Sequence, residues 1–198
     1  MPLIYPVGFM AAGGSWQTAY TKTISGTGAQ SFNTENFRMQ LVNADMTKTG
    51  GTQMRLTFTS HATNTLVVTD AYLQQSATSG YTTAAPSYST TPIQISCSAL
   101  NAGSPTGPWT LTAAGGPWVT DAIATGFTAG MVTNGLTIAF KFNNGSNMQL
   151  AASTSGSGTT ASYKTPGVDE ASTVTVSGYV ASTDVYKSIL VSKVELFV

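Results

Sequence analysis

The sequence contains few charged residues, and those it has are balanced and dispersed. Charged side chains make up 8% of the 198 residues, with eight Lys plus Arg against eight Asp plus Glu. A protein that neutralises nucleic-acid phosphates needs clustered basic side chains, whereas here each Lys and Arg stands alone. The composition therefore predicts no nucleic-acid partner and no long-range attraction of a charged ligand.

Catalytic side chains are equally scarce. His61 is the only histidine and Cys97 the only cysteine. His61 lies in a predicted turn, 60–63, and is expected to be solvated. Cys97 alternates with Ile93 and Ile95, which predicts a buried, inert thiol and excludes an intrachain disulfide. Nucleophilic catalysis needs a base beside the nucleophile, so we expect no enzyme. Two arrangements stay open: a pair of facing carboxylates, and His61 beside a hydroxyl in one pocket.

Metal ligands of the familiar kinds are also missing. One histidine and one cysteine are too few for a structural zinc site, and no Asp-rich loop of the EF-hand kind occurs. We therefore assign no metal site and no cofactor. A calcium site stays open in principle, built from backbone carbonyls and from acids among Asp45, Asp70, Asp121, Asp169 and Glu170.

Long apolar runs are absent. The first residues carry no basic start, and Pro2 and Pro6 interrupt their short apolar stretch, so no export signal and no membrane insertion are predicted. Residues 1–18 are interpreted as an N-terminal arm that either docks on a neighbouring subunit or folds against its own domain. The candidate assembly residues of this arm are Leu3, Ile4, Tyr5 and Phe9.

The pattern that is present has a period of two. In residues 37–42, for example, Phe37, Met39 and Leu41 share one face while Arg38 and Gln40 take the other, which is typical of a half-buried strand. The same reading predicts about ten strands, at 19–24, 37–42, 54–59, 64–75, 91–98, 118–124, 136–142, 159–164, 172–180 and 189–198.

Strands without intervening helices must pack sheet on sheet. Residues 19–198 are therefore predicted to form one all-β domain, an antiparallel β-sandwich of the jelly-roll type. The segments 37–42, 54–59 and 64–75 are interpreted as consecutive antiparallel strands. The apolar strand 189–198 is expected to be central, because such a strand would be hazardous at an exposed edge. Residues 101–117 and 151–161 are read as loops, rich in Gly with Pro or Ser.

Four aromatic residues in turn-rich segments are candidates for binding a sugar. A flat ring can stack on the apolar face of a sugar while nearby amides and hydroxyls bind its hydroxyl groups. The alternative is that each ring plugs an end of the sandwich. The candidates are Trp109, Tyr88, Tyr81 and Trp16.

Three successive segments, 37–41, 51–58 and 66–72, followed by 118–121, 129–130 and 136–140, form a pattern over residues 32–142 that resembles a known module. The pattern is similar to galactose-binding-like jelly-roll domains found in phage structural proteins and beside SGNH-type hydrolase domains. No Gly-Asp-Ser motif of such hydrolases occurs, so the resemblance implies no catalytic residue.

The resemblance implies a virion component, such as a capsid decoration, head fibre or tail-associated protein. Such a protein would be made in the host cytoplasm and assemble as a symmetric oligomer with copies of itself and with other virion proteins. The alternative that the resemblance implies is a carbohydrate-binding module, or a receptor-binding protein that recognises a cell-surface polysaccharide.

Overall fold

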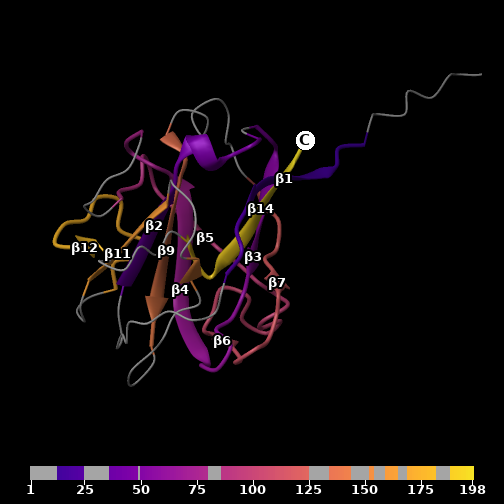
Figure 1. The fold of residues 1–198 in the computed structure, drawn as a ribbon, viewed down its shortest axis with the longest axis vertical. Helices are drawn as coiled ribbons and strands as arrows, with labels where there is room; N and C mark the ends of the chain where they lie inside the picture. The colour runs from indigo at the N-terminus through magenta and orange to yellow at the C-terminus, as the bar shows by residue number, and fades with distance from the viewer. Residues whose placement is uncertain are drawn as a thin grey trace, which may run out of the picture.

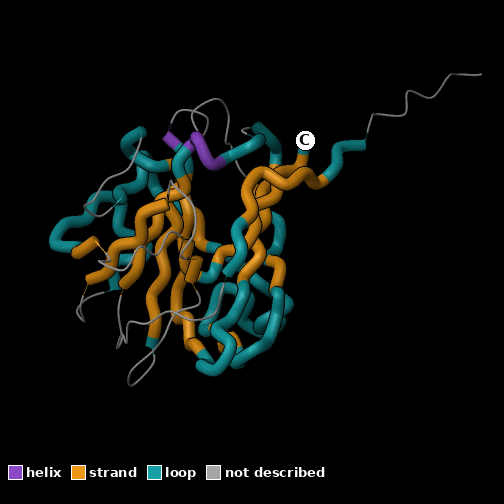
Figure 2. The backbone as a smooth tube through the Cα atoms, in the orientation of Figure 1, coloured by secondary structure: helices purple, strands orange, loops and turns teal. Residues whose placement is uncertain are grey.

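Two antiparallel sheets face each other in the computed structural model of the protein (Figure 1). Loops and turns connect the strands (Figure 2), and a short 3-10 helix, η1, spans Asn43–Asp45. The predicted antiparallel β-sandwich is confirmed. The structure describes residues 13–24, 36–48, 50–79, 86–124, 134–143, 152–153, 159–164, 169–181 and 188–198.

The smaller sheet has the order β1-β14-β3-β7, and β8 also pairs with β3. The predicted central position of the last strand is confirmed, because β14 hydrogen-bonds to β1 on one side and to β3 on the other. The strands are β1 (Trp16–Thr21), β3 (Gln53–Phe58), β7 (Trp118–Val119), β8 (Ile123–Ala124) and β14 (Val191–Phe197).

The larger sheet has the order β12-β11-β2-β9-β4-β5, with β6 also paired to β4. A separate two-stranded ladder joins β10 (Ala152–Ser153) to β13 (Ser188–Ile189). The strands of the larger sheet are β2 (Asn36–Leu41), β4 (Leu66–Gln75), β5 (Ile93–Gln94), β6 (Trp109–Leu111), β9 (Leu136–Phe142), β11 (Thr159–Lys164) and β12 (Val180–Ala181).

The core lies between the two sheets. Alternate residues of β2 and β9 point into it, as the period-two pattern predicts, and aromatic rings meet there edge to face. The Phe58 and Phe140 ring centroids, for example, lie 5.9 Å apart and join the smaller sheet to the larger one. One contiguous apolar cluster therefore spans both sheets.

Several sequence-based expectations about the strands are wrong. The three segments predicted to be consecutive neighbours do not pair with one another: β2 pairs with β9 and β11, β3 with β14, and β4 with β9. Long-range connections bring strands that are distant in sequence together, and an apolar period specifies a face without specifying a partner.

Segment boundaries also differ. Most of the predicted strand 172–180 is loop, with only β12 at its end, and the predicted loop 101–117 contains β6. β1 begins at Trp16, inside the region interpreted as the arm. No helix among the described residues is long and apolar enough to cross a membrane.

Candidate functional site

The outer face of the larger sheet, the side turned away from the core, is polar and buried. Asn36, Arg38 and Gln40 of β2 alternate with the core residues of that strand, yet at most 1% of each is exposed. Thr137 and Lys141 of β9 are also buried. A sheet covered on one side only would leave these positions in water, so a further layer must cover them.

Two loops form that layer. Residues 169–179 and the residues around Tyr88 lie over β2, β9 and β4, and Tyr88, Ala139 and Ala171 make a small apolar cluster separate from the main core. The Tyr88 hydroxyl donates to the Ala171 carbonyl over 2.9 Å, and the Tyr88 amide donates to the Val174 carbonyl over 2.9 Å. The two loops therefore bind each other as well as the sheet.

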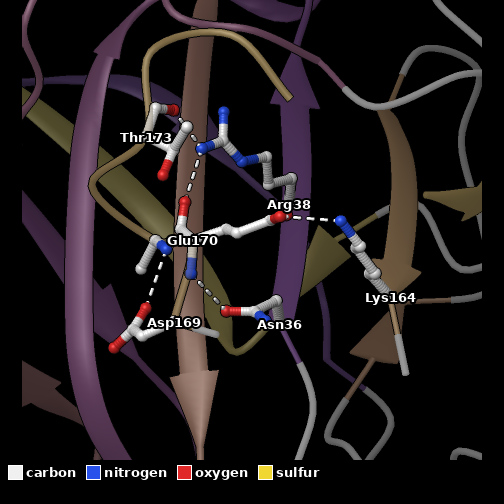
Figure 3. Close-up of polar contacts among 7 residues, drawn as sticks. Asn36, Arg38, Lys164, Asp169, Glu170 and Thr173 are labelled. Carbon is white, nitrogen blue, oxygen red and sulfur yellow. Dashed lines mark hydrogen bonds and ion pairs between the residues drawn. The ribbon is translucent and has the colours of Figure 1, made fainter. Parts of the chain in front are cut away.

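Arg38 is the centre of this arrangement (Figure 3). Its guanidinium donates to the carbonyls of Pro86 at 3.1 Å and Glu170 at 2.8 Å, and also to the carbonyl of Thr173. The guanidinium carbon lies 4.4 Å from the centroid of the Tyr88 ring. A charge with no exposed surface is tolerated only when hydrogen bonds and ring contacts replace its water, and Arg38 has both.

The covering segment 169–179 is fixed by three further polar contacts (Figure 3). The Glu170 amide donates to Asn36 Oδ1 over 3.0 Å, and the Ala171 amide donates to Asp169 Oδ1 over 2.8 Å. The ammonium of Lys164 on β11 lies 2.6 Å from Glu170 Oε1. The backbone of Glu170 is therefore held from both its amide and its carbonyl.

Two carboxyl groups from distant parts of the chain meet at the edge of this layer. Asp70 of β4 forms a side-chain hydrogen bond with Asp169, and Gln94 Nε2 of β5 lies 3.3 Å from Asp70 Oδ1. Burial, and next the neighbouring Asp169 carboxyl, raise the pKa of Asp70. Burial and the same two carboxyl groups raise the pKa of Tyr72, which lies beside them on β4.

This acid pair includes two of the five residues from which a calcium site could be drawn. Asp121 lies apart from it and accepts hydrogen bonds from the Ser98 amide and hydroxyl. Within the described ranges, no group of three or more His, Cys, Asp or Glu side chains could hold a metal ion. The Asp70 carboxyl can hold and transfer a proton, because burial and the neighbouring Asp169 carboxyl disfavour its ionised form.

Lys141 lies in the same face as the acid pair. Only 8% of the residue is exposed, and its Nζ atom makes no hydrogen bond with any described residue. Its cross-strand neighbours are Asn36 on β2 and Asp70 on β4. An amine buried without an acceptor is costly, and such groups mark candidate functional positions.

Two of the four candidates for the sugar platform are buried. Trp109 is buried in the main core, where its ring centroid lies 5.7 Å from that of Phe58. Tyr88 is buried under Arg38. Both rings already contact protein, so neither offers a face to a ligand. Tyr81 lies outside the described residues.

Trp16 keeps part of its surface exposed. Its ring centroid lies 5.4 Å from that of Phe197, and the Arg55 guanidinium carbon lies 4.3 Å from the ring centroid. Arg55 is in turn bound to Glu195 over 2.8 Å. The indole is thus held at the start of β1. The candidate assembly residues Leu3, Ile4, Tyr5 and Phe9 lie outside the described residues.

The expected solvated histidine is in fact buried. His61 is 3% exposed, and its Nδ1 accepts from the amides of Thr63 and Asn64, each over 3.1 Å. Burial lowers the pKa of His61. The imidazole closes its own turn, and its Nδ1 also lies 3.2 Å from the Thr63 hydroxyl oxygen of that turn.

The predicted buried thiol is confirmed. Cys97 has no exposed surface and belongs to the main core. Burial raises the pKa of its thiol, which keeps it protonated and unreactive.

Sequence reasoning missed the outer face entirely. Asn36, Arg38 and Gln40 alternate with apolar residues, and this pattern is that of a strand with one side in water. The covering loops come from residues far along the chain, and no local signal reports them. No protein-family model matches the sequence, and a search of curated proteins finds no match to it.

Proposed function

We propose that the protein is a non-catalytic structural component of a virus particle, which assembles as a symmetric oligomer through its N-terminal segment. The proposal combines the resemblance of residues 32–142 to jelly-roll modules of phage structural proteins with one structural observation. That observation is the firm attachment of the chain at residues 14–16, directly after the apolar N-terminal stretch of the sequence.

The attachment uses backbone and side-chain contacts. The Ser15 amide donates to the Val198 carbonyl over 2.7 Å, and the Val198 amide donates back to Ser15 over 3.1 Å. A Cβ atom at Gly14 would lie 2.6 Å from Phe197 Cε1, so only glycine fits there. β1 starts next to the C-terminus, at the rim of the smaller sheet (Figure 1).

The surface of the described residues supplies little apolar area for an interface. Its exposed large hydrophobic residues are Val119, Val180 and Val198. Specific interfaces need a contiguous apolar centre, and the N-terminal segment provides the required residue types. We propose that Leu3, Ile4, Tyr5 and Phe9 bind a neighbouring subunit.

Light scattering after size-exclusion chromatography tests the assembly. The wild-type protein is expected to be an oligomer of defined order, and the double variant Ile4→Ser, Phe9→Ser a folded monomer. Val119→Ser, which removes an exposed apolar side chain elsewhere, is the matched control and is expected to remain oligomeric. A wild-type protein that stays monomeric over a wide concentration range contradicts the proposal. Mass spectrometry of purified particles tests the virion assignment, which fails if the protein is absent from them.

Recognition of a surface polysaccharide is the second candidate, favoured by the group around Tyr72. An aromatic ring there lies beside the carboxyl groups of Asp70 and Asp169, and the amide of Gln94 is exposed. Such a combination can bind sugar hydroxyls. A glycan array tests it with the wild type, Gln94→Ala and Trp16→Ala. Loss of signal only in Gln94→Ala assigns binding to the Tyr72 group, and absence of any wild-type signal removes the idea.

A further inference from the structure

Three polar side chains lie in one row across the centre of the larger sheet. Lys141 of β9 is the cross-strand partner of Asn36 on β2 and, on its other side, of Asp70 on β4. All three lie on the outer face, since their neighbours Phe37, Phe140 and Ala71 belong to the core cluster. The Cβ atoms of directly opposed residues are about 4.5–5.5 Å apart, so the lysine chain can reach the side chain of either neighbour.

The first member of the row is a potential nucleophile. The Lys141 amine is withdrawn from water, and no described residue accepts a hydrogen bond from it. Among the described residues, two other lysines form ion pairs with a glutamate, Lys164 with Glu170 and Lys193 with Glu195. Lys141 is therefore placed as a reactive amine would be, out of water and without an ion-pair partner in the part of the chain that the structure describes, and not as a surface charge.

The second member is a polarised carbonyl. Asn36 is 1% exposed, and its Oδ1 accepts the backbone amide of Glu170 over 3.0 Å (Figure 3). Addition of a nucleophile to the Asn36 carboxamide would place negative charge on that oxygen. A fixed backbone N–H pointing at a developing oxyanion stabilises it. The loop that covers the sheet thus supplies the required donor.

The third member is a proton carrier. Asp70 is hydrogen-bonded to Asp169, and the raised pKa of Asp70 means that the pair keeps a proton more readily than an isolated aspartate does. A carboxyl pair of this kind can accept one proton and return it later in the same reaction. Gln94 fixes the Asp70 carboxyl in place.

We propose that Lys141 and Asn36 react to form an intramolecular isopeptide bond that joins β9 to β2. The ammonium of Lys141 gives a proton to the Asp70–Asp169 pair, and the amine attacks Asn36 Cγ. The attacking nitrogen passes its second proton to the Asn36 amide nitrogen, the C–N bond to that nitrogen breaks, and it leaves as ammonia. The ammonia then takes the first proton from the carboxyl pair and departs as an ammonium ion. The overall reaction converts an ammonium and a carboxamide into a secondary amide and an ammonium ion, with no oxidant, reductant or cofactor.

The bond would tie together two strands at the middle of the larger sheet, and it does not depend on the proposed role in a particle. It would close a long loop covalently, and the effect on the unfolded chain is the same in kind as that of a disulfide. Unlike a disulfide, it would survive reducing conditions.

Mass spectrometry of the denatured full-length protein tests the proposal. The wild-type protein is expected to be lighter than its sequence by one ammonia, and digestion is expected to yield a branched peptide that contains Asn36 and Lys141. Lys141→Met and Asn36→Ala are each expected to have their full sequence mass. Lys164→Arg, which changes another lysine at the same face, is the matched control and is expected to keep the branched peptide.

Three results would overturn the proposal. The first is a wild-type protein at its full sequence mass. The second is an ammonia loss that maps to a single unbranched peptide, as a succinimide would give. The third is a branched peptide that joins Lys141 to Asp70 with loss of water. Asp70→Asn provides the second variant: circular dichroism establishes that it is folded, and the branched peptide is expected to form at least tenfold more slowly in it. A folded Asp70→Asn that forms the bond at the wild-type rate contradicts the assigned proton carrier.

Discussion

Along β2 and β9, both faces of the larger sheet are buried, but by opposite means. On the core face, rings such as Phe37, Phe140 and Phe142 pack against the smaller sheet, with the Phe37 and Phe142 centroids 5.4 Å apart. On the outer face, Asn36 and Arg38 are covered by loops that contribute backbone carbonyls and amides. Packing of rings tolerates small shifts, whereas hydrogen bonds to a buried charge tolerate very few.

The two faces therefore make different contributions to the fold, one to its stability and the other to the arrangement of its loops. The core face supplies most of the favourable free energy of folding, because it removes apolar surface from water. The outer face contributes less net free energy but allows only one arrangement of the covering loops. The proposed reaction of Lys141 with Asn36 needs that fixed arrangement. Apolar covering loops would not supply the backbone N–H that binds Asn36 Oδ1.

The largest expected effect comes from the core face. Phe140→Ala removes a ring that contacts Phe58 of the opposite sheet and Phe142 of the same strand. Truncation of a buried phenylalanine costs about 3–5 kcal/mol. Urea unfolding followed by fluorescence is expected to show a lower midpoint for the whole domain. A loss below about 1 kcal/mol would mean that the two sheets do not share one core.

The second effect separates the two faces on a single strand. Arg38→Lys keeps the charge but loses the fork that reaches three carbonyls and the ring contact with Tyr88, and we expect a cost of about 2–3 kcal/mol. Hydrogen exchange is expected to accelerate at the amides of Tyr88 and Glu170, while the exchange rates of core amides change less. Met39→Leu, one residue on and facing the core, is the control and is expected to cost less than about 1.5 kcal/mol. Equal losses of stability in Arg38→Lys and Met39→Leu would contradict the proposed difference between the two faces.

A smaller effect concerns pH. The raised pKa of Asp70 means that the folded protein holds this proton more tightly than the unfolded chain. Its contribution to stability is therefore complete below the ordinary aspartate pKa of about 3.9 and is lost as the pH rises through the folded value. Asp70→Asn is expected to remove this downward trend. Urea unfolding midpoints measured between pH 3 and 8 check this prediction. The same dependence of the midpoint on pH in the wild type and in Asp70→Asn would refute it. Burial and then the Asp169 carboxyl raise the pKa of Asp70, and the hydrogen bond from Gln94 opposes them. Tyr72 and Lys141 are the other polar groups that lie beside Asp70.

The smallest effect is expected at Gln40. This side chain of the outer face donates to the Thr78 carbonyl over 3.1 Å, while its buried Oε1 has no partner among the described residues. Gln40→Leu loses one hydrogen bond and removes one unsatisfied acceptor, and these changes nearly cancel. We expect a change within about 1 kcal/mol in thermal unfolding. A large loss would show that Gln40 specifies the cover as strongly as Arg38.

The core face could be predicted from the sequence, and the outer face could not. Alternation in 37–42 and 136–142 located two central strands and identified Phe37, Met39 and Phe140 as inward-facing. The same alternation placed Arg38 in water, because a local pattern cannot report a cover formed by residue 170 or 173. Partner choice failed for a similar reason: β2 and β9 are distant in sequence, and many apolar strands could pair with either.

The candidate site depends on these long-range arrangements. Asp70 and Asp169 were recognised as acids without any sign that they meet, and Lys141 looked like an ordinary strand lysine. The aromatic candidates show the opposite error, since residues predicted to lie in open loops are buried. Trp109 lies in a Gly- and Pro-rich segment that resembled an open loop, yet β6 folds that segment against β4 and turns the indole into the core.

The central position of β14 has a consequence for synthesis of the chain. β1 and β3 flank β14 and are not neighbours of each other in the smaller sheet, so neither can complete its ladder until residue 197 has left the ribosome. During translation, the apolar faces of β1 and β3 therefore stay unpaired until β14 has been synthesised. Such long-range pairing slows folding and prolongs exposure of strand edges, and a chaperone that shields nascent strands would have its longest contact with this sheet.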